Sequence, residues 1–277
     1  IEEFASLYRG VSADLASART RYGDTELAVE LNNLVSRGYA HLYAAKPARL
    51  SKFIRFFTHD YPALIADNSR AVFFSLAIFF AFTLIGYFAQ SFDPRLADSF
   101  VPKAFLSMYE DEIRRQGHMD RDIDFAERSA FSTQIMTNNI QVSFMAFAGG
   151  MLFGIGTLYI AVNNAMMLGV MGKMFSDYGL TLNYLAFIMP HGALELPAIL
   201  LAAAAGFVLG GALINPRGMT RGDSLRKGAG VAAQMMFGVV ALLLVAGVIE
   251  GFFTPIIWIP DWVKVIVSGF ILFAFLA

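Results

Sequence analysis

The chain has 277 residues, of which 57% are hydrophobic and only 16% are charged, with a formal net charge of −1 and no cysteine. Soluble domains carry about 25% charged residues, so this apolar surplus exceeds what a water-soluble core can bury and predicts an integral membrane protein rather than a soluble enzyme. The charge balance gives no indication of a nucleic-acid partner, and the lack of cysteine excludes disulfides, thiolate metal sites and cysteine nucleophiles.

Residues 1–70 form a polar N-terminal region that we expect to be helical and cytoplasmic or interfacial. Apolar residues recur at helical spacing between Phe4 and Leu15 and again between Leu27 and Val35, which predicts two helices. The run 49–57 alternates cations with large apolar residues, a pattern typical of a helix lying in the membrane interface. The alternative is a soluble helical hairpin packed on the rest of the protein.

Long apolar stretches in residues 71–277 predict an all-α, polytopic membrane helix bundle with about six transmembrane helices. Residues 71–89 contain no charge and are long enough, at about 1.5 Å per residue, to cross a hydrocarbon core of about 30 Å. Residues 90–137 are polar again and predict an amphipathic helical outer loop. Asn163 and Asn164 interrupt the next apolar stretch. The expected spans are 71–89, 140–162, 164–177, 183–213, 229–253 and 261–277.

The distribution of lysine and arginine predicts the orientation in a cell membrane. Basic residues gather before the first span and in loop 214–228, whereas loop 90–137 is rich in acids. Because cytoplasmic loops carry the excess of Lys and Arg, we expect both termini and loop 214–228 in the cytoplasm and loop 90–137 outside. This path requires segment 164–177 to cross the membrane rather than to re-enter from one side.

Ionisable residues inside spans cost about 2.5–3.5 kcal/mol each on insertion scales, so each needs a physical reason. His191 and Glu195 are four residues apart, share one helical face, and are bracketed by Pro190 and Pro197. Glu250 lies in another span, at a depth where it could meet them. The candidate polar cluster comprises His191, Glu195, Glu250, Asn138, Asn139 and Asn164.

Two interpretations of this cluster stay open. In the first, it is a buried hydrogen-bonded network that holds helices together. In the second, it binds a proton, a metal ion or a substrate group, with His191, Glu195 and Glu250 as the ligands of any metal. The sequence contains no H-E-x-x-H, G-x-S-x-G, P-loop or Rossmann motif. We therefore name no catalytic residue and disfavour an enzyme; the sequence implies no cofactor and leaves its identity unknown.

Glycines also recur at helical spacing in two spans. Gly150 and Gly154 form one Gly-x-x-x-Gly pair, and Gly206 and Gly210 form another. Small residues at this spacing let helices approach closely. We interpret both pairs as internal packing contacts rather than as a dimer face.

The order of motifs over residues 138–255 resembles the stage II sporulation protein M family of bacterial and archaeal membrane proteins. The resemblance rests on Asn138-Asn139, on Gly154-Ile155-Gly156-Thr157, on the run from Pro190 to Ala198, on Ala204-Ala205-Gly206 and on the run from Ala246 to Phe252. It implies that His191, Glu195 and Glu250 are the family's polar motif residues, without a settled chemistry. In spore formers, the family member is a scaffold in a membrane complex that controls peptidoglycan hydrolysis.

These observations lead to two main functional hypotheses. The first is a non-enzymatic membrane scaffold or regulatory protein that recruits cell-envelope remodelling partners through its soluble faces. The second is a transporter or channel whose site contains His191, Glu195 and Glu250, because broken helices at membrane depth often mark transport sites. An intramembrane hydrolase is a weaker third hypothesis, since the sequence lacks the corresponding motifs.

Overall fold

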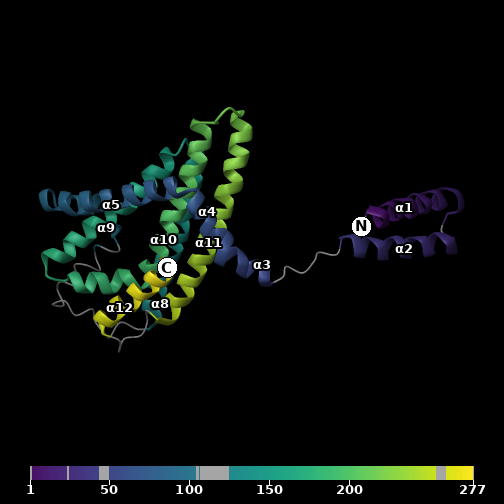
Figure 1. The fold of residues 1–277 in the computed structure, drawn as a ribbon. Coiled ribbons are helices and arrows are strands. Elements are labelled where there is room, and N and C mark those ends of the chain that lie inside the picture. Colours follow the sequence, from purple (N-terminus) through teal and green to yellow (C-terminus); the bar gives the residue numbers. More distant parts are fainter. Residues whose placement is uncertain are drawn as a thin grey trace. The chain divides into compact units, whose positions relative to one another are not determined.

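The computed structural model describes residues 2–23, 25–43, 50–103, 106, 125–253 and 260–276, and the regular structure within these ranges is entirely helical. The all-α expectation is therefore confirmed (Figure 1). The chain divides into two compact units, residues 1–56 and 57–277.

The first unit is a helical hairpin followed by a short helix. It consists of α1 (Glu2–Tyr22), α2 (Glu26–Tyr43) and α3 (Leu50–Arg55). Gly23 ends α1 with a φ of +64°, and its N–H donates to the Arg19 carbonyl at 3.2 Å, the left-handed termination that glycine adopts most readily. The two helices expected from the spacing of apolar residues are both present.

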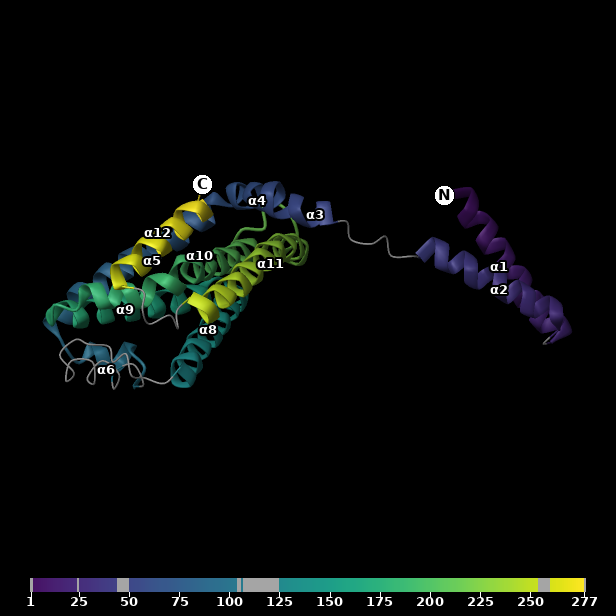
Figure 2. The same ribbon diagram turned by 90° about the horizontal axis from the view of Figure 1, so that it is seen from below.

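The second unit is a bundle built around α10 (Thr181–Ile214). This helix packs against α5 (Ser69–Phe92), α8 (Phe125–Ala148), α9 (Ile155–Asp177), α11 (Arg221–Phe253) and α12 (Asp261–Leu276). Figures 1 and 2 show the antiparallel pair formed by α10 and α11 and the pair formed by α5 and α9. Alanines 202–205 of α10 are almost fully buried, because α10 has neighbours on every side. The remaining elements are the π-helical turn η1 (Phe56–Asp60), α4 (Tyr61–Asp67), α6 (Leu96–Phe100) and the 3-10 turn η2 (Gly149–Met151).

Four helical segments of the described residues are long and apolar enough to cross a membrane: Ser69–Phe92, Ile155–Asp177, Gly192–Ile214 and Arg221–Gly247. A shorter apolar helix covers Trp262–Phe273. The outer surface of α5 carries exposed phenylalanines, among them Phe73, Phe80 and Phe88. Large apolar side chains on the outside of a bundle are suited to lipid rather than water. The protein is therefore a membrane protein, and the number of six spans stays a prediction.

The break between the second and third apolar segments lies elsewhere than expected. The sequence places it at Asn163 and Asn164, but α9 runs without interruption through both residues. Their side-chain amides donate to the carbonyls of Tyr159 and Ile160, one turn back, at 2.8 and 2.9 Å. Asparagine satisfied inside its own helix need not end that helix. The chain turns instead between Ala148 and Ile155, where Gly154 has a φ of +80°.

Two glycines bring α5 and α9 into backbone contact. A Cβ atom on Gly86 of α5 would lie 2.7 Å from the Met166 carbonyl oxygen, and one on Gly169 of α9 would collide with the Thr83 carbonyl. Only glycine permits so close an approach. At this contact α5 presents Gly86 to α9, whereas Phe73, Phe80 and Phe88 of the same helix are exposed.

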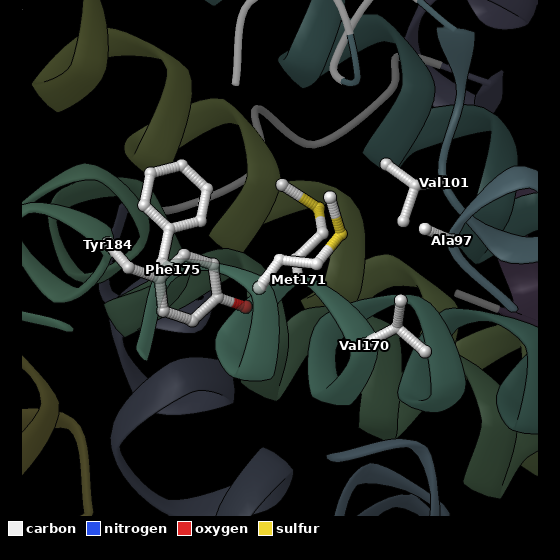
Figure 3. Close-up of a cluster of buried hydrophobic side chains, with 7 residues drawn as sticks. Ala97, Val101, Val170, Met171, Phe175 and Tyr184 are labelled. Atoms are coloured by element: carbon white, nitrogen blue, oxygen red, sulfur yellow. The ribbon is translucent and has the colours of Figure 1, made fainter. Parts of the chain in front are cut away.

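An apolar cluster holds α6 against α9 and the start of α10 (Figure 3). Phe175 and Tyr184 stack with ring centroids 5.3 Å apart, and the Tyr184 hydroxyl donates to the Leu168 carbonyl at 2.7 Å. The buried members are Ala97, Val101, Val170, Met171, Met174, Phe175 and Tyr184. The cluster fixes the turn between α9 and α10, and thereby sets how α10 enters the bundle.

Candidate functional site

The candidate site lies between α8 and α10. Glu195 of α10 is almost completely buried, with 1% of its surface exposed. The Asn139 side-chain amide of α8 donates a hydrogen bond to Glu195 Oε2. This contact joins residues that are 56 positions apart in the chain, and it brings together two members of the polar cluster expected from the sequence.

Two oxygen atoms at this interface are buried without a hydrogen-bond partner in the described part of the chain: Glu195 Oε1 and Ser143 Oγ. Ser143 is four residues after Asn139 on α8, so both side chains project from the same side of the helix. Sequence reasoning missed Ser143, because a single serine in an apolar run costs little. Its position one turn from Asn139 is the signal that could have identified it.

Small residues hold η2 and the start of α9, which follow α8 in the chain, against α10. A Cβ atom on Gly150 would collide with the Gly206 carbonyl, and one on Gly210 would lie 2.6 Å from the Gly154 amide nitrogen. The two Gly-x-x-x-Gly pairs therefore face each other, which confirms that they are internal packing contacts. Thr157, fully buried on α9, donates from its hydroxyl to the Ala146 carbonyl at 2.7 Å.

The other end of α8 is held by α11. A Cβ atom on Gly247 of α11 would collide with the Met136 sulfur of α8. Met136, Asn139, Ser143, Ala146 and Gly150 are separated by three or four residues and so form one continuous stripe. Its first four members lie on the face of α8 that packs into the bundle, and Gly150 follows in η2.

The remaining residues of the expected cluster lie elsewhere or outside the described side chains. Asn138 is exposed and lines a shallow polar groove along α8 with Thr133, Gln134, Thr137 and Gln141. The Asn164 amide bonds within α9. The backbones of His191 and Glu250 belong to α10 and α11, but their side chains are outside the described part of the structure. Among the described residues, no group of three His, Cys, Asp or Glu side chains could hold a metal ion.

Pro190 and Pro197 lie inside α10, on either side of Glu195. Proline has no N–H, so the carbonyls four residues earlier, those of Ala186 and Ala193, lose their helical donors. The helix changes direction along its length (Figure 1), as prolines inside helices commonly cause. Freed carbonyls at membrane depth are tolerated where they are buried in protein, and both alanines are buried.

Apolar helices with lipid-facing phenylalanines, closed around a buried carboxylate, define a helical integral membrane protein. The family model described as Stage II sporulation protein M matches residues 75–255, from α5 to the region just after α11. The match covers more than half of the chain, and the chain therefore belongs to this family. The expectation from the motif order is confirmed.

Two further comparisons concern parts of the chain. Residues 1–44, which contain α1 and α2, match a model described as a domain of unknown function, DUF8413. A segment of 74 residues is 38% identical to an uncharacterised protein of Methanocaldococcus jannaschii, covering 26% of this chain and 42% of that protein. The chain thus spans less than half of the relative's length. No solved structure matches the chain.

Proposed function

We propose that the protein is a non-enzymatic membrane scaffold or regulatory protein that recruits cell-envelope remodelling partners through its N-terminal hairpin. The observation that supports this role is the apolar surface of α1 and α2. Leu7 and Leu27 are 63% and 54% exposed, and Phe4 and Leu34 are also exposed. Leu27 and Leu34 are two helical turns apart and share one face of α2.

A hairpin of this size is too small to enclose a core of its own. Among its described side chains, Leu15, Ala18 and Ala28 are the buried ones. Exposed apolar surface of this kind marks sites of interaction with other proteins or with membranes. In the orientation expected from the basic residues of loop 214–228, the hairpin is cytoplasmic, while the bundle anchors it in the plasma membrane.

The test is affinity purification of the tagged full-length protein from its native membranes after cross-linking. We expect a reproducible set of envelope proteins whose recovery falls at least tenfold in the double variant Leu27→Ser/Leu34→Ser. The control is Asn33→Ser, an exposed polar substitution on the same helix, which should leave recovery unchanged. Recovery of the protein alone, or equal recovery from all three proteins, would refute the proposal.

Transport is a second candidate function, because Glu195 is a buried carboxylate with an unpaired oxygen inside an apolar helix that contains two prolines. Its test is a flux assay in proteoliposomes that compares the wild type with Glu195→Gln. An amide keeps the shape of the side chain but cannot titrate. Identical flux in the two proteins, or no flux in either, would remove this candidate.

A further inference from the structure

The loop that joins α10 to α11 carries exposed cations at the shared end of two apolar segments (Figure 1). The segment Gly192–Ile214 ends where this loop begins, and the segment Arg221–Gly247 starts where the loop ends. Both are long enough to cross a membrane, so the loop lies at the boundary between lipid and water. Its four exposed cations, the basic cluster, are Arg217, Arg221, Arg226 and Lys227.

The basic cluster has little compensating negative charge. Asp223 is the one acid within residues 214–228, so this stretch has four cations, one acid and a net charge of +3. The Asp223 carboxylate accepts a hydrogen bond from the Thr220 hydroxyl at 2.7 Å. None of the four cationic side chains forms an ion pair with the described part of the chain. An exposed group of like charges of this kind attracts anions from its surroundings.

The spacing of the cations on α11 matches the depth of a lipid headgroup layer. Arg226 and Lys227 follow Arg221, the first residue of α11, by five and six positions. At about 1.5 Å per residue, they lie about 8–9 Å further along the helix axis. The headgroup region on each side of the hydrocarbon core is about 5–8 Å thick. Because neighbouring positions on a helix point about 100° apart, the cations reach headgroups around the helix rather than one enclosed pocket.

Apolar side chains next to the cations favour a lipid over a water-soluble polyanion such as a nucleic acid. Ile214 is 65% exposed and Met219 is 39% exposed, and both belong to the same turn of the chain as the cations. Exposed apolar side chains interleaved with Lys and Arg suit the boundary between headgroups and acyl chains. Water-soluble anions offer nothing to cover these apolar side chains.

The ends of the two helices are fixed to each other next to the basic cluster. The Ser224 hydroxyl of α11 donates to the Ala212 carbonyl of α10 at 2.8 Å. A Cβ atom on Gly228 would lie 2.8 Å from the Ala212 Cβ, so the two backbones are in close contact there. The cations therefore extend from a rigid pair of helices, and their backbone positions are set before a ligand binds.

We propose that the basic cluster binds the headgroups of acidic phospholipids at the end of the α10–α11 pair. The arginine guanidinium groups offer paired N–H donors to the phosphate oxygens, and Lys227 adds a further positive charge. This inference does not depend on the scaffold role proposed above.

The test is electron paramagnetic resonance of the full-length protein reconstituted in phosphatidylcholine vesicles. Spin-labelled phosphatidylglycerol and spin-labelled phosphatidylcholine are the probes, and their motionally restricted fractions give a relative association constant. We expect phosphatidylglycerol to be preferred about fivefold, the effect of about one cation per headgroup. The preference should fall as NaCl is raised, because salt screens exposed charges.

The double variant Arg226→Gln/Lys227→Gln should reduce this preference at least twofold, whereas Arg226→Lys/Lys227→Arg keeps both charges and should retain it. The matched control is Arg9→Gln/Arg21→Gln, which removes the same charge from exposed positions on α1 and should leave the preference unchanged. If Arg226→Gln/Lys227→Gln does not reconstitute, Arg217→Gln/Arg221→Gln takes its place, with the same expected loss.

Three results would overturn the proposal. The wild type could restrict the two lipids equally. The glutamine variants of the basic cluster and of α1 could lower the preference by the same factor, which would assign it to overall charge. Inorganic phosphate could abolish the preference where NaCl of the same ionic strength does not, which would make the basic cluster a site for soluble phosphate.

Discussion

Replacing Gly206 with alanine tests the packing that positions the candidate site. A Cβ atom at Gly206 would collide with the Ala146 carbonyl oxygen and the Thr157 hydroxyl, and would lie 3.0 Å from Thr157 Cγ2. One of these atoms belongs to the backbone and the other two belong to a β-branched side chain, so the strain cannot be relieved by a simple rotation. Overpacking of this kind typically costs about 1–3 kcal/mol.

The collision also separates the Thr157 hydroxyl from the Ala146 carbonyl, and a hydrogen bond between membrane helices contributes about 0.6 kcal/mol on average. We therefore expect Gly206→Ala to lower the free energy of unfolding by about 2–3 kcal/mol. Gly211→Ala is the matched control, because it lies on the same helix and an added Cβ meets nothing within 4 Å. Its higher helix propensity should stabilise the protein by about 0.5–1 kcal/mol.

The assay is reversible denaturant unfolding of the wild type and both variants in the same detergent, followed by circular dichroism. The two glycine variants should move in opposite directions. If Gly206→Ala and Gly211→Ala unfold at the same denaturant concentration, α8 and α9 do not pack on α10 as described. The described geometry of the Glu195 site would then be wrong as well.

Three further predictions concern other parts of the bundle. Tyr61→Phe removes the 3.1 Å hydrogen bond from the buried tyrosine hydroxyl to the Met235 carbonyl, so it should reduce stability by about 1 kcal/mol; an unchanged midpoint of unfolding would mean that α4 is not anchored on α11. Glu195→Ala leaves the Asn139 amide unpaired and should cost about 1–3 kcal/mol, whereas Glu195→Gln should fold normally in a thermal melt; equal midpoints for wild type and the alanine variant would show that the side chain is not in a buried network. Single cysteines at Asp98 and Arg221, both exposed, should react with an impermeant thiol reagent from outside and from inside the cell, respectively, and the reverse pattern would invert the topology.

The sequence predicts the helical class and several spans because uncharged apolar runs have few alternatives to helices in lipid. The position of the turn after α8 could not be predicted in the same way. A pair of asparagines looks like an interruption, and a glycine-rich run looks like a span. The position of the turn depends on the hydrogen bonds of Asn163 and Asn164 inside α9 and on the positive φ of Gly154. Neither feature can be predicted from amino-acid composition.

The candidate site was predicted in part. The cost of burying a carboxylate correctly indicated that Glu195 needs a partner, and Asn139 is that partner in the structure. Neighbouring positions on a helix point about 100° apart, so the sequence could not separate Asn139, which faces α10, from Asn138, which is exposed. Ser143 was missed because its significance depends on which face of α8 is buried.

The contact between Gly86 and Gly169 bears on the order in which the protein is assembled. Of the four segments that are long and apolar enough to cross a membrane, α9 is the least apolar, so it gains least from lipid by itself. Its backbone fits directly against α5, which precedes it in the chain and is strongly apolar. We expect α5 to enter the bilayer first and then to hold α9 in the membrane through this helix–helix contact. A substitution that adds a side chain at Gly86 or Gly169 would therefore reduce the retention of α9 in the bilayer during biosynthesis, before α10 has been synthesised.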